Sequence, residues 1–537
     1  MGGGDRPNEY RGEVGNPKPA VPIPAPSGND EFRRGRVVPG EPDNKKLTVY
    51  YDGQCPMCSA IMESVRNSAK VDDFDLRDMH TERSLPFSRD AIEKEIHVTD
   101  PDGSVHRGAA AIFRIAEQYP GLRIAARFGR MPLMRALAPP VYGLVAANRR
   151  FIAGPASRIF WLKIAVIVFF CIGLFMSAPA WIGPRSYPEA PVFSALPAVD
   201  GPLAVVLFAA LFGLAVAIVM SPKPQRWIAA FLAIIGFLCV FDQTRWQPWV
   251  FQYAVMLTTL ALFSWDRDDA DGRQRALNIL RLVVAGTYVF SGLQKLNSNF
   301  VEYEFPWMVQ PITNVLPRTV GLFYFFGMCV PFIQVAFGIG LLTRRFRRVS
   351  LILAVAMHVF ILAMLGPAGY DWNNIVWPWT AAMAVFDLLL FSSRADFSLR
   401  DVLGTKGHFH HAVAFALFAL LPFLSFFNLW DSYLSSALYS GNLTEAQIYA
   451  SDAGRKALPQ TIQRYLVHTS PDTNVLNLQR WAIEDLNVSP YPETRVFKQI
   501  AKSVCNRLAD RSQLVLNVRE QRMFFSRPET VYRCRDL

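Results

Sequence analysis

Long apolar segments in the middle of the chain limit most strongly what it can fold into. A helix needs about 20 mostly apolar residues to cross the roughly 30 Å hydrocarbon core of a bilayer. Since 51% of the 537 residues are hydrophobic and only 18% are charged, a single soluble domain is excluded. We predict a polytopic all-α membrane domain over residues 156–430. Its nine candidate transmembrane segments are 159–183, 202–221, 227–245, 247–265, 276–296, 319–343, 349–368, 374–393 and 409–429.

Basic residues gather on one side of these segments. Residues 121–158 carry seven arginines and no acid, at helix-like intervals among apolar residues, which is typical of a segment lying on a membrane surface. With the N-terminus inside, the inner flanks carry 19 Lys and Arg against 4 on the outer side. By the positive-inside rule we expect a cytoplasmic N-terminus, an extracytoplasmic C-terminus and a place in the cell (inner) membrane.

The net charge of +11 first raises the question of a nucleic-acid partner. Most of this charge flanks the apolar segments, so membrane lipids are the expected contact and no nucleic acid is expected. Outside the membrane domain, residues 1–44 are rich in Gly, Pro and charge, and predict a disordered tail without a signal peptide. Residues 431–537 predict a small extracytoplasmic region, in which Cys505 and Cys534 are candidates for a disulfide.

Residues 45–155 have the pattern of an α/β domain. A β-rich run at 47–51 ends in Asp-Gly, and helical spacing of apolar residues follows from Met57. A second short strand, a polar helix, a hairpin turning on Asp102-Gly103 and a last helix complete the unit. The order β, α, β, α, β, β, α is that of a thioredoxin-like fold.

Two cysteines lie at the first strand-to-helix junction, in the sequence Cys55-Pro56-Met57-Cys58. The unpaired N–H groups of a helix N-terminus stabilise a thiolate, so we expect Cys55 to have a lowered pKa and to be the attacking sulfur. Cys58 would then resolve the mixed disulfide, and Asp52 is a candidate for proton transfer as well as an ordinary turn residue. Half of a zinc site and an inactive cysteine pair are the alternatives.

These residues resemble a known family. Asp52-x-x-Cys55-x-x-Cys58, the helix start Gly108-Ala109-Ala110 and the later Tyr142-x-x-Val145-Ala146-x-Asn148-Arg149 together resemble the DCC family of thiol-disulfide oxidoreductases, over roughly residues 45–155. The resemblance implies a thioredoxin-like, redox-active domain. Lys94-Glu95 stands where thioredoxins keep a cis-proline before the third strand, so substrate docking is expected to differ.

Ionisable residues near or inside membrane segments are costly and are therefore candidates for function. Asp242 and Arg245 fall at the outer end of the third segment, Lys295 at the outer end of the fifth, and His358 near the middle of the seventh. Each also has a structural explanation, such as an interfacial ion pair for Asp242 and Arg245 or a hydrogen bond between helices for His358. Their common side of the membrane favours a shared site, in which we expect Lys295 and His358 to be catalytic and Asp242 and Arg245 to bind the cofactor.

The sequence around Lys295 carries a second resemblance. Gly292-Leu293-Gln294-Lys295-Leu296 resembles the helix end that carries the catalytic base of vitamin K-dependent gamma-carboxylase, and the segments around Asp242 and His358 are similar to the HTTM membrane domain of that enzyme and its bacterial relatives. The resemblance implies that Lys295 deprotonates a reduced quinone or similar acid. The C-terminal region does not match the carboxylase, so carboxylation of glutamate does not transfer.

Three hypotheses follow. The first is a membrane-bound thiol-disulfide oxidoreductase that uses Cys55 and Cys58 on a thiol protein. The second is a quinone- or lipid-acting membrane enzyme that uses Lys295, with the N-terminal domain as redox helper. The third is a non-catalytic membrane scaffold or transporter, which needs neither site.

Overall fold

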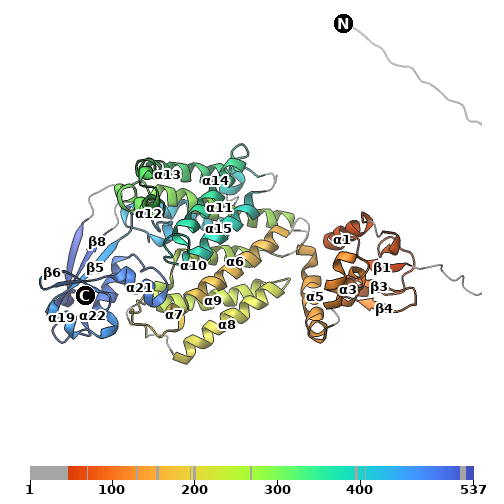
Figure 1. The fold of residues 1–537 in the computed structure, drawn as a ribbon, viewed down its shortest axis with the longest axis horizontal. Helices are drawn as coiled ribbons and strands as arrows, with labels where there is room; N and C mark the ends of the chain where they lie inside the picture. The colour runs from red at the N-terminus through yellow and green to blue at the C-terminus, as the bar shows by residue number, and fades with distance from the viewer. Residues whose placement is uncertain are drawn as a thin grey trace, which may run out of the picture.

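Three parts follow one another along the length of the molecule (Figure 1). An α/β region lies at one end, a helical body in the middle and a β-sheet region at the other end. The computed structural model describes residues 46–68, 71–128, 131–152, 157–193, 195–197, 201–265, 269–392, 397–404, 407–520 and 528–537. The tail predicted for residues 1–44 lies outside these ranges.

The N-terminal region is a four-stranded mixed sheet with helices, and its elements follow in the predicted order. The strands are arranged β2-β1-β3-β4; β1 pairs with β2 in parallel, and the other pairs are antiparallel. All five residues of β1 are buried, as expected for an apolar central strand. The elements are β1 (Leu47–Tyr51), α1 (Pro56–Arg66), β2 (Phe74–Asp78), α2 (Arg89–Lys94), β3 (His97–Thr99), β4 (Val105–Arg107) and α3 (Ala109–Ala116).

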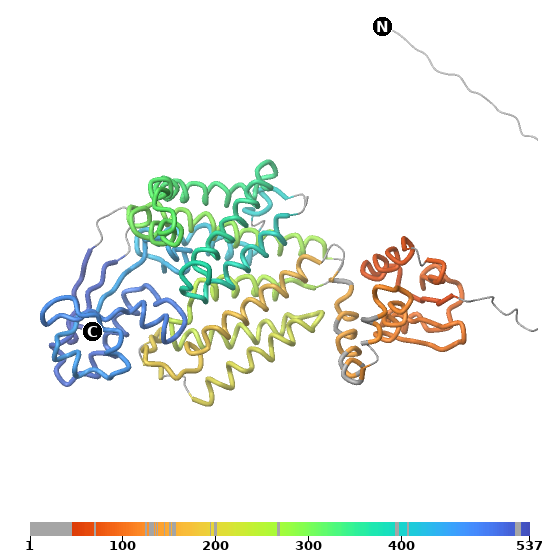
Figure 2. The backbone as a smooth tube through the Cα atoms, in the orientation of Figure 1, coloured from red at the N-terminus to blue at the C-terminus, as the bar shows by residue number. Residues whose placement is uncertain are grey.

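The basic stretch joins the α/β region to the body as two helices, α4 (Arg123–Phe128) and α5 (Pro132–Ile152). Helix α5 packs against α1 and α3 on one side and against the first body helix, α6 (Ser157–Met176), on the other. Figure 2 traces this path from the α/β region into the body. Asn148 of α5 also donates a hydrogen bond to the carbonyl of Met220, 3.1 Å away, so α5 contacts both parts.

Within the described residues, the helical body contains six helical segments long and apolar enough to cross a membrane. Each of the nine predicted segments contains an apolar helix, but three of these helices are shorter, so the count of nine is not confirmed. The six are Ser157–Met176, Gly201–Met220, Ala270–Gln294, Pro317–Leu341, Arg347–Leu365 and Phe409–Phe427, and the shorter three are Gln225–Phe241, Pro248–Leu262 and Val376–Phe391.

Helix α11 (Ala270–Gln294) is the central element of the body. It packs against α10 (Pro248–Leu262), α13 (Val320–Leu341) and α15 (Val376–Phe391). The other helices surround this group. Most of them contribute to one apolar core, whereas α12 contributes to a smaller cluster around Phe300. They are α7 (Ala178–Ile182), α8 (Gly201–Met220), α9 (Gln225–Phe241), α12 (Phe305–Val315), α14 (Arg347–Leu365), α16 (Leu399–Leu403), α17 (Phe409–Phe415) and α18 (Leu421–Leu424).

The C-terminal region is a five-stranded antiparallel sheet with helices. Its strands are arranged β6-β7-β5-β8-β9. The side chain of Asp485 joins this region to the body by accepting hydrogen bonds from the backbone N–H groups of Ser186 and Tyr187. The elements are β5 (Glu445–Ala450), α19 (Asp452–Ala457), α20 (Gln460–Gln463), β6 (Leu466–Ser470), β7 (Thr473–Leu476), α21 (Leu478–Leu486), α22 (Thr494–Cys505), β8 (Leu514–Arg519) and β9 (Glu529–Arg533).

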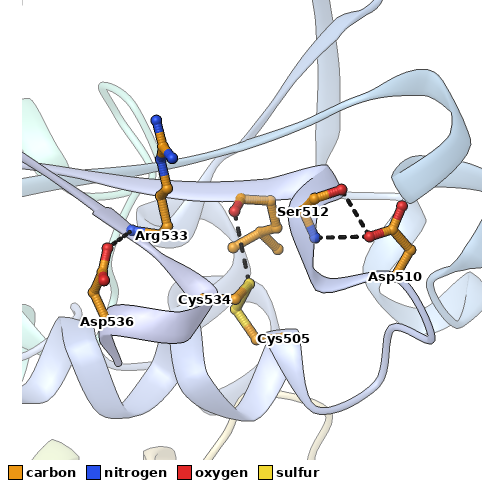
Figure 3. The surroundings of a disulfide bond; sticks show 7 residues. Cys505, Asp510, Ser512, Arg533, Cys534 and Asp536 are labelled. Atoms are coloured by element: carbon orange, nitrogen blue, oxygen red, sulfur yellow. Dashed lines mark hydrogen bonds between the residues drawn. A yellow bond between two sulfur atoms is a disulfide. The ribbon is translucent and has the colours of Figure 1, made fainter.

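Cys505 and Cys534 form a disulfide, which the sequence left open (Figure 3). Cys505 ends α22 and Cys534 follows β9 directly, so the bond ties the last strand to the helix that covers the sheet. Both residues are buried. The other five cysteines, Cys55, Cys58, Cys171, Cys239 and Cys329, are free thiols.

Candidate functional site

The two cysteines of the N-terminal region lie where β1 passes into α1. Cys55 is the residue before the first turn of α1, and Pro56 occupies the first helical position, where its missing N–H is not needed. The turn before it is tight. A Cβ atom at Gly53 would lie 2.0 Å from Oδ2 of Asp78, so only glycine fits there, and its N–H donates to Asp78 across 2.9 Å.

The helix start changes the acidity of both thiols. A hydrogen bond from the Cys58 side chain lowers the pKa of Cys55 to about 6 against the opposing effect of burial, with help from the backbone N–H groups of Cys58 and Met57 and the charge of Arg149. The same hydrogen bond, with burial and the neighbouring Cys55 charge, raises the pKa of Cys58. The pair is therefore asymmetric, with Cys55 as the thiolate at neutral pH.

The Cys55 side chain is fully buried, whereas Cys58 is half-buried at the edge of the apolar core of the region. Helix α5 packs directly against α1. A disulfide substrate can reach the Cys55 sulfur only if one of the elements around α1 moves. In this conformation the nucleophilic sulfur is acidified but buried.

Asp52 is buried beside the cysteines and has charged and polar neighbours. Nε2 of His80 lies 2.9 Å from Oδ1 of Asp52, and Arg149 lies 3.7 Å from Oδ2. The N–H of Gln54 donates to Oδ1 across 3.0 Å. Arg149 also donates to the carbonyl of Glu93. His80 is the member that reaches solvent, because its side chain is 29% exposed against 1% for Asp52.

This arrangement defines a class of protein for the N-terminal region. A dithiol whose first sulfur is an acidified thiol at a helix start, on a mixed α/β sheet, is equipped for thiol-disulfide exchange. In agreement, residues 49–155 match the family model described as DCC1-like thiol-disulfide oxidoreductase. The match supports a thiol-disulfide oxidoreductase role for this region. No curated protein and no solved structure matches the chain.

A second site lies inside the helical body. A cavity of about 160 Å³ lies between α11, α12, α13, α14 and α15 and is lined mainly by apolar side chains. The sequence candidates Lys295 and His358 both line it. Its other polar lining residues are Thr287, Tyr288, Ser291, Gln334, Trp379, Thr380, Ser436 and Tyr439.

Lys295 ends α11 and is held at the cavity by its own helix. Its Nζ donates to the backbone oxygen of Ser291 over 2.9 Å and to the Ser291 hydroxyl over 2.6 Å. Gly292, one helical position further on, has a packing function: a Cβ atom there would lie 2.8 Å from the Pro331 carbonyl. The glycine of the Lys295 motif therefore lets α13 pack closely against α11.

His358 belongs to a buried hydrogen-bonded chain. The hydrogen bond between helices that was considered for His358 is present, but its partner Tyr288 and the carboxylate of Asp387 were not predicted. Its Nε2 lies 2.7 Å from the hydroxyl of Tyr288, and that hydroxyl donates to Oδ2 of Asp387 across 2.6 Å. The three residues come from α14, α11 and α15. Asp387 is fully buried.

Asp242 and Arg245 are held elsewhere and do not line the cavity. Oδ2 of Asp242 lies 2.6 Å from Arg185, and Arg245 donates to the carbonyls of Ala180 and Leu238 across 2.9 and 2.8 Å. These contacts fix the loops that surround α7 and the end of α9. The structure thus gives both residues a structural role and does not bring them to Lys295.

Proposed function

We propose that the protein is a membrane-bound thiol-disulfide oxidoreductase that uses the Cys55–Cys58 dithiol of a thioredoxin-like domain on the cytoplasmic side. The observation that carries this proposal is the acidified Cys55 thiol at the start of α1, in the region that matches the oxidoreductase family. The substrate would be a disulfide bond of another protein, which the reaction reduces to thiols.

The reaction balances in two steps. The Cys55 thiolate attacks one sulfur of the substrate disulfide, which forms a mixed disulfide and releases the other substrate sulfur as a thiolate. Cys58 then loses its proton and attacks the Cys55 sulfur, which releases the second substrate thiolate and leaves a Cys55–Cys58 disulfide. The substrate gains two electrons, and a cytoplasmic thiol donor returns the pair to the dithiol.

Asp52 is suited to accept the proton of Cys58 in the second step. The Cys58 thiol has a raised pKa and needs a base, and the charge of Asp52 is one of the causes of that increase, so the two groups lie close together. His80 provides a hydrogen-bonded neighbour that is open to solvent.

The membrane placement rests on the helical body. Six helices can cross a membrane by length and composition, and the α/β and β-sheet regions lie at its opposite ends (Figure 1). The inner flanks of the apolar segments hold most of the basic residues. This favours a place in the cell membrane with the α/β region on the cytoplasmic side. The Cys505–Cys534 disulfide fits an oxidising, extracytoplasmic compartment for the other end.

The direct test is the reduction of a disulfide-bonded protein by the full chain in nanodiscs, with dithiothreitol as electron donor. Cys55→Ser and Cys58→Ser should each abolish the reduction above the dithiothreitol background. Cys239→Ser removes a buried thiol of the helical body and should leave the rate unchanged. Equal rates for the wild type and Cys55→Ser would refute the proposal.

A second candidate function is favoured by the cavity. Lys295 and His358 come from distant segments yet line one mainly apolar space in the body, as expected of a gamma-carboxylase-like enzyme acting on a quinone or lipid. In that case the N-terminal region would serve as a redox helper. Reconstitution with a reduced quinone tests it: Lys295→Ala should stop consumption of the quinone. Lys163→Ala, at another buried lysine of the body, is the control and should not.

A further inference from the structure

The chain Asp387–Tyr288–His358 links a buried carboxylate to the cavity of the helical body. Asp387 and Tyr288 are 0% and 1% exposed and His358 is 6% exposed. Tyr288 and His358 line the cavity, and Lys295 lines it two helical turns after Tyr288 on the same helix. The geometry therefore places two proton carriers and a cation at one apolar space, with the Asp387 carboxylate hydrogen-bonded to Tyr288 behind it.

With Asp387 ionised, the hydrogen-bond pattern assigns the other protons of the chain. Tyr288 has one hydroxyl proton and donates it to Asp387. The contact between Tyr288 and His358 therefore requires a proton on Nε2 of His358, which donates to the Tyr288 oxygen. A neutral imidazole with its proton on Nε2 has a lone pair on Nδ1. This Nδ1 is buried and has no hydrogen-bond partner within the described part of the chain.

The negative charge of an ionised Asp387 has few partners that compensate it. Its Oδ1 is buried without a hydrogen-bond partner among the described residues, and its Oδ2 accepts from the Tyr288 hydroxyl. A buried carboxylate with so few partners is costly. Lys295, the cation of the same cavity, donates to two oxygens of Ser291, and the carboxylate of Glu304 lies close enough to interact with its charge. Moving the negative charge from Asp387 toward Lys295 would therefore lower the electrostatic cost.

We infer that Asp387, Tyr288 and His358 form a proton relay for a lipid-soluble ligand with an acidic hydroxyl, a phenol or an enol. The O–H bond of the ligand breaks and its proton binds Nδ1 of His358. The Nε2 proton passes to the Tyr288 oxygen, and the Tyr288 proton passes to Asp387. The products are a ligand oxyanion beside Lys295, a neutral histidine and a neutral Asp387.

The ligand class follows from the same groups. The mainly apolar lining selects a lipid-soluble molecule, and Nδ1 of His358 requires a hydrogen-bond donor. A phenol, with an acidity near the tyrosine value of about 10, can be ionised by such a site, whereas an alkyl alcohol is far less acidic. The inference rests on the second candidate function, because both use this cavity, but it makes His358 the proton acceptor and gives Lys295 the role of stabilising the oxyanion.

The experiment uses the full chain in nanodiscs and 4-butyl-2-nitrophenol, whose ionised form absorbs visible light. At a fixed pH, the ratio of ionised to neutral probe should be about tenfold higher with the wild type than in empty nanodiscs, which corresponds to one pKa unit of the probe. Tyr288→Phe and Asp387→Asn should each return the ratio to the empty-nanodisc value while the probe still binds. Because Tyr288→Phe and Asp387→Asn are both measured, the relay can still be refuted if one of the two variants does not fold.

Tyr253→Phe is the matched control, because Tyr253 of α10 is a buried tyrosine of the helical body that does not line the cavity. It should leave the excess ionisation unchanged. The relay is overturned if the wild type shows no excess, if Tyr288→Phe keeps it, or if both tyrosine variants lose it equally. An excess that depends on Lys295 but not on Tyr288 would overturn the relay and leave the second candidate function in place. If the probe does not bind, the result counts against both the relay and the second candidate function.

Discussion

Nε2 of His80 lies 2.9 Å from Oδ1 of Asp52, and this contact connects the buried dithiol region to solvent. Asp52 follows β1 and His80 follows β2, so the parallel pairing of these strands brings the two residues together. Asp52 is 1% exposed and therefore cannot exchange protons with water directly. A proton taken from Cys58 by Asp52 has His80 as its hydrogen-bonded route outward.

The first prediction concerns this route. Asp52→Asn should slow release of the mixed disulfide by about 100-fold, the usual scale for loss of a general base, and His80→Gln should slow it to a smaller extent. Stopped-flow measurement of the second substrate thiolate checks both. His106→Gln removes a histidine that pairs with Asp100, 3.2 Å away, and should have no effect. Equal rates for Asp52→Asn and the wild type would remove Asp52 from the reaction.

The second prediction is the pH dependence of Cys55. Only the thiolate is alkylated, so the rate with iodoacetamide should rise as the pH passes through about 6 and become constant above it. Arg149→Met removes a positive charge that favours the thiolate and should move this rise upward, by up to about one unit. At pH 6 the variant is therefore the slower one.

Arg107→Met is the control for this titration, since Arg107 is an exposed arginine of β4 that packs over Phe87. Its alkylation profile should match the wild type. Modification of Cys58 before Cys55, or a rise near the ordinary thiol value of about 8.5, would contradict the assignment of Cys55 as nucleophile.

The third prediction is topological. A reporter fused after Leu537 should behave as extracytoplasmic and one fused before Lys45 as cytoplasmic, because the basic flanks favour that orientation. Alkaline phosphatase and green fluorescent protein fusions report the two sides. If both ends report the same side, the number of crossings is even and the three shorter apolar helices do not all span the bilayer.

The fourth prediction concerns the C-terminal disulfide, which closes a loop of 29 residues. Cys534→Ser should destabilise the C-terminal region by roughly 3–4 kcal/mol, the scale expected from loop closure. The urea concentration at which a protease cuts this region of the full chain should fall accordingly. Cys171→Ser, which removes a free thiol of α6, should leave it unchanged. An unchanged midpoint for Cys534→Ser would mean that the sheet and its contacts to the body hold the region without the bond.

Much of the fold could be predicted because it is local in sequence. Alternating and helical apolar spacing gave the order of elements in the N-terminal region, including the helix start after Cys55. Apolar runs located the helices of the body, but three of these helices are shorter than the predicted segments, so the number of crossings stays a prediction. The C-terminal disulfide could be suspected from its two cysteines, whereas the pairing required the packing of α22 beside the end of β9.

The site in the helical body could be predicted only in part from the sequence. We grouped Asp242, Arg245, Lys295 and His358 by their side of the membrane. Depth in the membrane does not define lateral position, and of these four residues Lys295 and His358 alone line the cavity. Asp387 was missed, although a carboxylate within an apolar helix is a signal that could have found it. His80 and Arg149 reach Asp52 through tertiary packing, which sequence spacing does not reveal.

Trapping the mixed disulfide tests the central claim most directly. The full chain with Cys58→Ser, mixed with a disulfide-bonded peptide, should accumulate a covalent adduct at Cys55, because the attacking thiolate is present and the resolving thiol is not. Peptide mapping by mass spectrometry under non-reducing conditions identifies the modified residue. The account predicts a stable adduct at Cys55 in Cys58→Ser and none in Cys55→Ser. An adduct at Cys58 in Cys55→Ser, with none at Cys55 in Cys58→Ser, would contradict it.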